Sequence, residues 1–378
     1  MATCKFCGKE SSLVSKILQI CRECIINADK NKVKEHLLNV HSKVRLSENL
    51  PVIPPKSKEK NIRFSCNLCI NKCKVSEDDK SYCGLRDYQK NEQGNLSYPT
   101  KDKAYMHGYL DSNPTNCCNS WFCPAGTSRG YPEYSIYDGD ETGTYSYAAF
   151  LYGCSFDCLF CQNSSHKHFT KDDLMEAEAV ADRIFKNKNI TCMCFFGGDP
   201  EPQLPFTVHL AELVLEKIDE AREENRKFRV CWEWNGSGRQ DLMEQCMKIA
   251  LKTGGNIKFD LKTYHEQLNI ALCGTSNKRT LKNFKYLGEN YFGTRNTLPE
   301  LSGCTLLVPG YTNSKEIERI AKFIANINPE IPYSLLVFHP DYMMKDLPYT
   351  SKKQAYKCLE IAETYLEHVH LGNEFLLH

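Results

Sequence analysis

Short apolar runs alternate with segments of helical period along the chain from about residue 145 onward. Each run has the length and the β-branched or aromatic content of a buried strand. Six such runs are SYAAFLYG (146–153), ITCMCFF (190–196), KFRVCWEW (227–234), NIKFDLK (256–262), GCTLLVP (303–309) and YSLLVFH (333–339). This repeat of strand and helix predicts a parallel sheet with right-handed crossovers, either open and doubly wound or rolled into a partial barrel.

The segments between the runs predict helices that cover the sheet. Apolar residues recur at steps of three and four between Leu174 and Ile184, and Thr170 with Asp173 supplies a capping pair for this first helix. Further helices are predicted near residues 206–224, 240–253, 314–327 and 351–367.

The chain before residue 145 shows little periodicity and many turn residues and cysteines. Residues 47–63, SENLPVIPPKSKEKNIR, contain three prolines and several lysines, which is typical of a linker. The predicted organisation is a cysteine module at 1–45, a linker at 46–63, a cysteine-rich extension at 64–145 and the α/β domain at 146–378. Such a linker would let the module fold apart from the α/β domain.

The composition narrows the classes of function. With 378 residues and a net charge of +1, the chain can bury a sizeable core and has no general attraction to nucleic acid or anionic membranes. No apolar run reaches the roughly 18 residues of a membrane span and no signal peptide is apparent, so we expect a cytoplasmic protein without a membrane span. In that reducing compartment, closely spaced cysteines indicate metal binding or catalysis rather than disulfides. Isolated cysteines are expected to be ordinary small core residues, namely Cys192, Cys194, Cys231, Cys246, Cys304 and Cys358.

Unusual residues follow nearly every predicted strand. The carboxyl ends of parallel strands are where α/β proteins bind ligands, so these residues are expected to form one site. In chain order they are Cys154, Cys158, Cys161, Gly197, Gly198, Asp199, Pro200, Asn235, Gly236, Asp260, Lys262 and His339.

Three cysteines within the eight residues from Cys154 to Cys161 are the most specific of these signals. A four-iron cluster normally takes four thiolates, one per iron, so three thiolates leave one iron open to a ligand. An open position separates a metal centre that performs chemistry from one that is only structural. A zinc site completed by His166 or His168 is the alternative.

The spacing Cys154-x3-Cys158-x2-Cys161, with Phe160 before the last cysteine and Gly-Gly-Asp-Pro at 197–200, resembles the radical S-adenosylmethionine (SAM) superfamily. Further segments resemble its AmmeMemoRadiSam subgroup, itself similar to the activating enzymes of pyruvate formate-lyase. These are SCNLCINKCKVSEDDKSYCGLR (65–86), LLVPGYTNSKEIERIAKFI (306–324), FHPDYMMKDLPYTS (338–351) and HLGNE (370–374).

The resemblance implies an α/β fold, a partial (βα)6 barrel of the radical SAM type preceded by a cysteine-rich N-terminal region. It implies a [4Fe–4S] cluster on Cys154, Cys158 and Cys161 whose fourth iron binds SAM. An electron from a low-potential donor such as ferredoxin or flavodoxin would cleave SAM to a 5′-deoxyadenosyl radical. That radical would abstract hydrogen from an unidentified substrate, which can be a protein, under anaerobic conditions.

The resemblance also implies roles for residues around the cluster. The segment Gly197, Gly198, Asp199 and Pro200 would receive the methionine amino group, Lys262 the methionyl carboxylate, and His339 would lie near the ribose. Phe160 and Asn235 would complete the cofactor site. Asp199 stands where glutamate is common, and the text around Asn235 departs from the usual pattern.

Two further cysteine quartets precede the predicted barrel. Cys4, Cys7, Cys21 and Cys24 have the paired spacing of a zinc-knuckle or rubredoxin-like site for zinc or iron. A two-Cys, two-His finger of Cys21, Cys24, His36 and His41 is an alternative. Cys66, Cys69, Cys73 and Cys83 suit zinc or an auxiliary cluster, and Cys117, Cys118 and Cys123 supply further ligands or none.

Three functions are therefore compared. The leading one is a radical SAM enzyme with an unknown substrate, and the second is an activase for a glycyl radical protein. An RNA-binding or RNA-modifying protein that docks through the N-terminal finger is the third, but the near-neutral charge argues against it.

Overall fold

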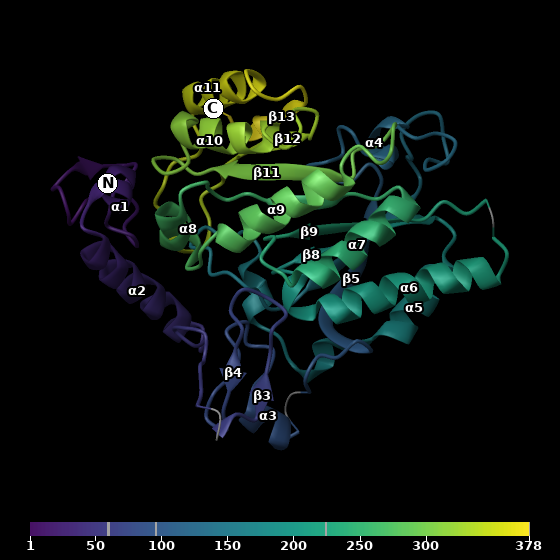
Figure 1. Ribbon diagram of the computed structural model, residues 1–378, viewed down its shortest axis with the longest axis horizontal. Helices are drawn as coiled ribbons and strands as arrows, with labels where there is room; N and C mark the ends of the chain where they lie inside the picture. Colours follow the sequence, from purple (N-terminus) through teal and green to yellow (C-terminus); the bar gives the residue numbers. More distant parts are fainter. Residues whose placement is uncertain (59–60, 95–96, 224, 378) are drawn as a thin grey trace.

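The structure, a computed structural model, describes residues 1–58, 61–94, 97–223 and 225–377. Its centre is a nine-stranded sheet with the strand order β13-β12-β11-β10-β9-β8-β6-β5-β7 (Figure 1). The strands are β5 (Lys103–Ser112), β6 (Tyr145–Leu151), β7 (Leu174–Glu176), β8 (Ile190–Gly197), β9 (Arg229–Trp234), β10 (Ile257–Asp260), β11 (Leu301–Leu307), β12 (Tyr333–Val337) and β13 (Val369–Gly372).

All six predicted strands are present and neighbouring ones pair in parallel, and β13 extends the parallel set. Strands β5 and β7 were not predicted; they add an antiparallel edge beside β6. β5 lies in the cysteine-rich region, and only its first half is buried, so its apolar pattern is incomplete. The mixed α/β architecture agrees with the predicted radical SAM type of barrel.

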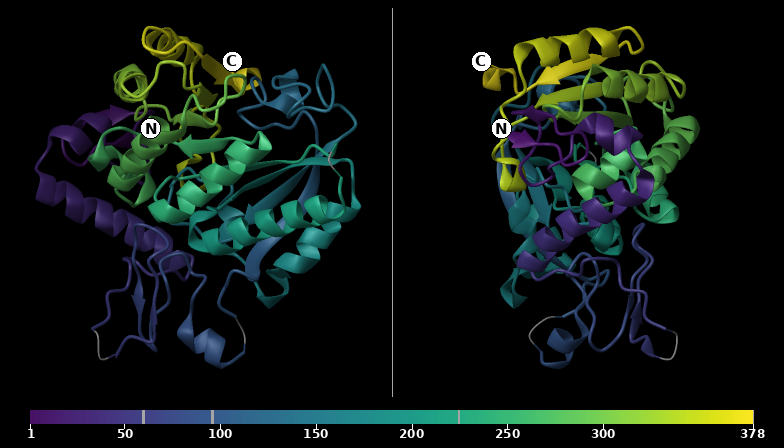
Figure 2. Two further views of the ribbon diagram at one scale, coloured as in Figure 1. Left: turned by 45° about the vertical axis from the view of Figure 1, so that its right-hand side comes forward. Right: turned by 90° about the vertical axis from the view of Figure 1, so that its left-hand side faces the viewer.

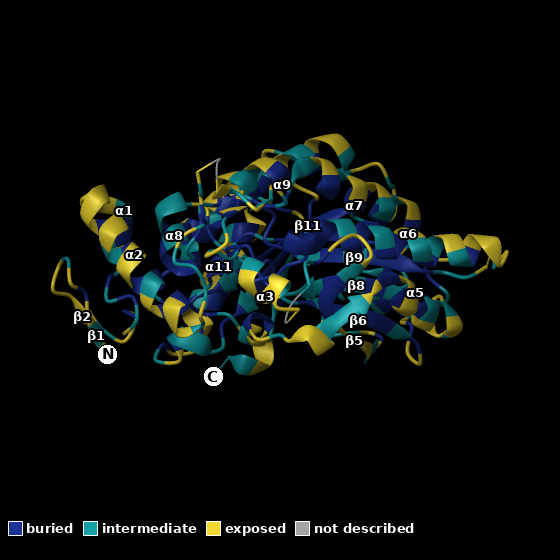
Figure 3. Ribbon diagram, turned by 90° about the horizontal axis from the view of Figure 1, so that it is seen from below, coloured by how far each residue is buried: buried dark blue, intermediate teal, exposed yellow. Residues whose placement is uncertain are grey.

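Helices connect the strands and cover the sheet, with their exposed sides turned to solvent (Figure 3). They are α5 (Ala177–Lys186), α6 (Leu204–Glu220), α7 (Gln240–Thr253), α9 (Lys278–Tyr291), α10 (Ser314–Ala325) and α11 (Lys352–Glu363). Their apolar sides join the strands in one buried cluster. Among the described residues, no helix combines the length and apolar character that a membrane crossing needs.

The predicted cap of the first helix is wrong in its position. Thr170 and Asp173 do form a capping box, but it closes a single 3-10 turn at Lys171–Asp173. Leu174 then enters the edge strand β7, and α5 begins only at Ala177. Leu174 fits the helical period of the sequence, but in the structure it pairs with β5 and joins the sheet. This pairing is not visible in the sequence.

The N-terminal residues are packed against the barrel. They form β1 (Ala2–Thr3), β2 (Glu10–Ser11), α1 (Arg22–Asn27) and α2 (Lys30–Ser47). Both helices lie along one side of the molecule, with α1 next to α8 (Glu266–Cys273) (Figures 1 and 2). Ile25 and Leu37 belong to the same buried cluster as Leu272 and Phe338 of the barrel. The expectation that the module folds apart from the domain is therefore wrong, although its predicted boundaries remain a prediction.

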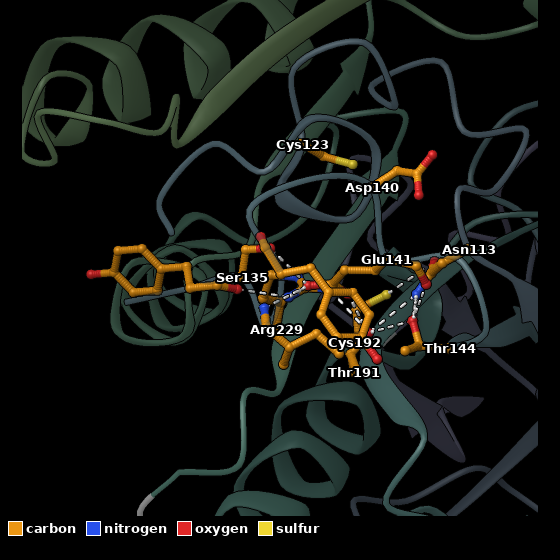
Figure 4. Close-up of polar contacts among 12 residues, drawn as sticks. Asn113, Cys123, Ser135, Asp140, Glu141, Thr144, Thr191, Cys192 and Arg229 are labelled. Atoms are coloured by element: carbon orange, nitrogen blue, oxygen red, sulfur yellow. Dashed lines mark hydrogen bonds and ion pairs between the residues drawn. The ribbon is translucent and has the colours of Figure 1, made fainter. Parts of the chain in front are cut away.

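The segment between β5 and β6 lies over the sheet, anchored by a buried ion pair (Figure 4). Glu141 accepts hydrogen bonds from both terminal nitrogens of Arg229 in β9 and from Thr191 in β8. Both charged side chains are almost fully buried. Because the pair is satisfied by several hydrogen bonds, it fixes this segment in place, including the short helix α4 (Pro124–Thr127).

Candidate active site

The loop after β6 brings three cysteines to the carboxyl ends of the parallel strands. Cys154, Cys158 and Cys161 line one cavity of about 200 Å³. Gly197 and Gly198, at the end of β8, line the same cavity. The cysteines and glycines predicted at the ends of the first two strands therefore lie in one site.

Backbone contacts with α8 hold this loop. The N–H of Asp157 donates to the carbonyl oxygen of Cys273 at 2.8 Å. The N–H of Leu159 donates to the carbonyl oxygen of Leu272 at 2.9 Å. The apolar side chains of the loop are buried, Leu159 completely. The aromatic and aliphatic residues between the cysteines therefore serve as anchors that leave the thiols facing the cavity.

The two glycines at the end of β8 are required by close backbone approach. Gly197 has φ +115°, and a Cβ there would lie 2.6 Å from the backbone nitrogen of Leu151. A Cβ on Gly198 would lie 2.4 Å from the carbonyl oxygen of Gly153. Side chains at either position would push the end of β8 away from the cysteine loop.

Burial and hydrogen bonds determine the state of the thiols in this loop. The N–H of Phe156 and the side-chain amide of Asn235 each donate to Cys154 Sγ at 3.3 Å. Burial raises the pKa of the Cys154 thiol, and it raises that of Cys161 to about 12. Such buried thiols become thiolates when a cation takes the place of the proton. A cationic iron cluster fits this donor set.

A single zinc ion fits it less well. Sulfurs around a tetrahedral zinc lie about 3.8 Å apart, given Zn–S bonds of about 2.3 Å. Among the described residues, only the N-terminal quartet gathers three or more ligand atoms within 4.8 Å of one another. His166 does line the cavity, but His168 is exposed and hydrogen-bonds Glu48 at 2.8 Å. The zinc alternative at this loop is not supported by these positions.

Comparison with known proteins identifies the domain that carries this loop. The model of the family described as "Radical SAM superfamily" matches residues 149–324, which include all three cysteines and the Gly197–Gly198 pair. Residues 149–324 therefore form a radical SAM domain. This radical SAM enzyme is thereby expected to use the cofactors of its superfamily, a [4Fe–4S] cluster and SAM.

Similar proteins place this radical SAM enzyme near the activating enzymes. A Methanocaldococcus jannaschii protein named as a glycyl-radical enzyme activating enzyme is 29% identical over 60% of this chain and 80% of its own length. Pyruvate formate-lyase 1-activating enzyme of Escherichia coli is 26% identical over 51% of this chain and 74% of its own. An uncharacterized M. jannaschii protein is 24% identical over 82% of this chain and 81% of its own.

The cofactor residues predicted for a radical SAM enzyme divide into two groups. Five line the cavity with the cysteines, namely Phe160, Gly197, Gly198, Asn235 and Lys262. Asp199, Pro200 and His339 lie outside its lining. Asp199 is buried and accepts hydrogen bonds from the N–H and the hydroxyl of Ser155, next to Cys154. His339 packs edge-on against Tyr349 at a centroid distance of 5.2 Å. The cofactor roles of all eight residues remain predictions.

A second acid lies beside Asp199 and was not predicted. Glu201 is fully buried, and Ser237 donates to its Oε2 at 2.6 Å. Burial raises the pKa of both carboxyl groups, and the negative charge of Asp199 raises that of Glu201 further. Ser155 Oγ donates to both carboxylates, so the pair positions Ser155 rather than lining the cavity.

Charged side chains of β9 and β10 form the opposite wall of the cavity. Lys258 Nζ lies 2.7 Å from Glu233 Oε2 and 3.3 Å from Asp260 Oδ1. Lys262 Nζ lies 2.6 Å from Asp260 Oδ2. Burial would raise the pKa of Asp260, but the charges of Lys258 and Lys262 outweigh it and lower the pKa to about 2. Glu233 and Lys258 were not predicted. Their alternation with apolar neighbours along each strand is the signal that identifies a polar inner face.

The helix α2 reaches the cysteine loop through a buried carboxylate that the sequence analysis also missed. Asp157, which precedes Cys158, accepts from His41 Nδ1 at 2.9 Å and from Lys167 at 3.0 Å. Arg45 NH1 lies 3.5 Å from the same carboxylate. All four side chains are at most 6% exposed. The hydrogen bonds and charges outweigh the effect of burial and keep the pKa of Asp157 well below its usual range.

The N-terminal quartet is a separate, preformed thiol site. The sulfurs of Cys4, Cys7, Cys21 and Cys24 lie within 4.8 Å of one another, and the Cys7 and Cys21 sulfurs are 3.8 Å apart. That spacing matches the roughly 3.8 Å expected between sulfurs around a tetrahedral ion. Backbone hydrogen bonds, against the effect of burial, lower the pKa of Cys4 to about 6. The site therefore fits one tetrahedral metal ion.

The histidines of the alternative finger point elsewhere. His36 Nε2 lies 2.6 Å from the carbonyl oxygen of Leu18, and His41 contacts Asp157 as described above. The finger of Cys21, Cys24, His36 and His41 is therefore wrong. Both histidines lie on α2, and its docking against the barrel commits them to other partners.

The second predicted quartet is less compact. Cys66 and Cys73 join a small apolar cluster with Val75 and Tyr82, and Cys83 contacts the hydroxyl of Ser81 at 3.3 Å. Within the described residues these sulfurs are not drawn together as the N-terminal ones are. This spacing does not favour a single zinc ion, and an auxiliary cluster on Cys66, Cys69, Cys73 and Cys83 stays a prediction.

Proposed function

We propose that this protein binds a [4Fe–4S] cluster through Cys154, Cys158 and Cys161 and uses it to cleave SAM reductively, generating a radical that removes hydrogen from a substrate. The observation that carries the proposal is the single cavity that three loop thiols share with the Gly197–Gly198 turn. The match of this region to the radical SAM family supports it. When bound, the cluster and SAM supply the electron transfer and the 5′-deoxyadenosyl radical.

The chain's own residues would bind and orient these groups. Asn235 and the N–H of Phe156 hold Cys154 in place through its sulfur. Lys262, whose pKa stays raised because Asp260 and nearby thiols outweigh burial, keeps a positive charge on the cavity wall, which suits the methionyl carboxylate. The carbonyl oxygens at the Gly197–Gly198 turn suit its amino group. Burial of the surrounding loop excludes water from the reacting centre.

A protein substrate is the second candidate. The names of two similar proteins refer to the activation of a glycyl radical enzyme or of pyruvate formate-lyase. By analogy, the radical would be passed to a glycine of a partner protein. Either function needs a low-potential electron donor of the ferredoxin or flavodoxin class.

The N-terminal quartet is proposed to hold a structural zinc ion. Four thiols fill a tetrahedral shell and leave no position for chemistry. Zinc analysis of anaerobically purified protein tests this, and iron in place of zinc at these four cysteines would contradict it.

Cleavage of SAM tests the proposed function directly. With dithionite under strict anaerobiosis, the iron-loaded protein should release 5′-deoxyadenosine and methionine. Cys358→Ser is a matched control, because Cys358 is buried in α11 within the main core. An iron-loaded protein that forms no 5′-deoxyadenosine would contradict the proposal. Adding a candidate glycyl radical protein and measuring a glycyl radical by electron paramagnetic resonance separates the two candidate substrates.

A further inference from the structure

A thiol faces the cavity from the wall opposite the cysteine loop. Cys304, in the middle of β11, lines the same cavity as Cys154, Cys158 and Cys161. From its isolated position in the sequence, Cys304 was predicted to be an ordinary core residue. Its place on the cavity wall makes it a candidate for chemistry instead.

A second thiol lies against Cys304. Ser334 is the register partner of Cys304 in the neighbouring strand β12, and its hydroxyl donates to the carbonyl oxygen of Cys118 at 2.8 Å. This contact places the Cys118 segment beside Cys304, and the two thiols influence each other directly. Two residues 186 positions apart in the chain, 304 minus 118, are therefore neighbours on the inner face of the sheet.

The segment that carries Cys118 is firmly held. Asn119 donates to Asn256 Oδ1 at 3.0 Å, and Trp121 Nε1 donates to Ser334 Oγ at 3.1 Å. The buried pair of Glu141 and Arg229 anchors the same segment further along (Figure 4). Because buried contacts fix the position of Cys118, the pair of Cys118 and Cys304 is a defined part of the barrel interior.

The surroundings make the two thiols unequal. The neighbouring Cys117 and Cys304 thiols lower the pKa of Cys118, assisted by the nearby charge of Lys258. The same contact with Cys118, together with burial, raises the pKa of Cys304. Cys304 thus retains its S–H hydrogen, and Cys118 is the thiol of the pair that loses its proton more readily.

We propose that Cys304 returns a hydrogen atom to a substrate radical formed in this cavity, with Cys118 as its partner. This inference rests on the proposed function. An S–H bond is weaker than most C–H bonds, so a carbon radical can take the hydrogen atom and leave a thiyl radical on Cys304. The thiyl radical combines with the Cys118 sulfur to a disulfide radical anion, and the Cys118 thiol proton is released. One electron from the ferredoxin- or flavodoxin-class donor and two protons then restore both thiols.

The proposal specifies the class of reaction. A substrate that loses one hydrogen atom and receives another leaves the site as a closed-shell product, as in an epimerisation or a rearrangement. An activase instead leaves its radical on the partner protein and needs no such donor. The thiol pair therefore favours a turnover reaction on the substrate over stable radical storage.

The pairing can be tested without any cofactor. Mild oxidation of the purified full-length protein with diamide, followed by alkylation and peptide mass mapping, should give a Cys118–Cys304 disulfide. Cys358→Ala is the control and should keep it. A Cys117–Cys118 disulfide alone, or no disulfide at either residue, would overturn the pairing.

The hydrogen return is tested with SAM as the probe. In deuterium oxide and without substrate, the 5′-deoxyadenosyl radical should take deuterium from Cys304, so that 5′-deoxyadenosine carries the label. The label should be lost in Cys304→Ser, whose O–H bond is too strong to donate, and kept in Cys358→Ser. Unlabelled 5′-deoxyadenosine from the wild type, or an unchanged label in Cys304→Ser, overturns the inference while leaving SAM cleavage intact. No 5′-deoxyadenosine from any of the proteins overturns the proposed function itself, and the hydrogen return with it.

Discussion

The N-terminal quartet and the barrel triplet use the same ligand chemistry in two different ways. The four sulfurs of Cys4, Cys7, Cys21 and Cys24 already lie within 4.8 Å of one another, and no further element is needed to complete a tetrahedral shell. Cys154, Cys158 and Cys161 instead line an open cavity whose other walls come from the ends of β8, β9, β10 and β11. A closed thiol site stabilises structure, whereas an open one depends on the whole barrel and leaves room for a reacting ligand.

The two sites are nevertheless connected by direct side-chain contacts. α2 follows the quartet in the chain, and its His41 and Arg45 contact Asp157 in the loop of the triplet. Apolar residues of both regions share one buried cluster. The comparison therefore predicts an asymmetry: damage to the quartet should reach the triplet, but loss of a triplet ligand should leave the quartet intact.

The largest effect is expected from Cys158→Ser. Loss of one of only three thiolates should remove the barrel iron and abolish formation of 5′-deoxyadenosine, while the N-terminal metal stays bound. Iron and zinc analysis of the anaerobically purified variant measures both sites, with Cys358→Ser as the control. Simultaneous loss of both metals would break the asymmetry.

The double variant Cys7→Ser, Cys24→Ser tests the opposite direction. Removal of two ligands should release the N-terminal metal and loosen α1 and α2, because a segment of this size has little core of its own. Since α2 contacts the triplet loop, we expect partial loss of barrel iron as well. Full retention of iron and of SAM cleavage would show that the two sites are independent.

Asp157→Asn tests the contact that joins the sites. The change leaves Arg45 and Lys167 buried without their carboxylate, which should cost about 3 kcal/mol of the free energy of unfolding. Urea denaturation measures it, and Asp138→Asn is the matched control because Asp138 is exposed. We also expect slower loading of iron. Equal stability of the two variants would contradict the assigned role of Asp157.

The charged wall of the triplet cavity makes the stability of the barrel depend on pH. The pKa of Asp260 is lowered to about 2 in the folded protein, so its charge adds stability that is present above about pH 4 and is lost as the pH falls toward 2. Asp260→Asn should therefore reduce the free energy of unfolding by about 2 kcal/mol at neutral pH, and the difference should vanish near pH 2. Urea titrations across this range check it; a difference that does not depend on pH would contradict the assignment.

The smallest effect is expected from His36→Ala. His36 contacts the carbonyl oxygen of Leu18 rather than the thiols, so the N-terminal metal content should be unchanged. Loss of this hydrogen bond should cost about 1 kcal/mol. A fall in bound metal would support the two-Cys, two-His finger and contradict a metal site formed by the four cysteines.

Local sequence patterns predicted much of this structure. The six parallel strands were predictable because buried strands of a parallel sheet are continuous apolar runs with turn residues after them. The Cys154 to Cys161 motif was readable because one loop supplies all three ligands. The N-terminal quartet was readable for a similar reason, since paired cysteines at short spacing approach one another without help from distant parts of the chain.

Contacts between distant segments could not be predicted. β5 and β7 exist as strands because they pair with β6 and with each other, and the docking of α2 on Asp157 joins positions more than a hundred residues apart. The same holds for Cys118 and Cys304, and for the turn of Asp199 away from the cavity toward Ser155.

The sequence by itself determined which segments become strands and helices and which cysteines act as local sets, because these depend on neighbours within a few residues. Only the tertiary structure decided which walls the cavity has, which charges face it and how the N-terminal region is attached. Those features arise when the sheet brings strand ends together, and burial then makes each charge and thiol depend on partners that the order of residues does not reveal.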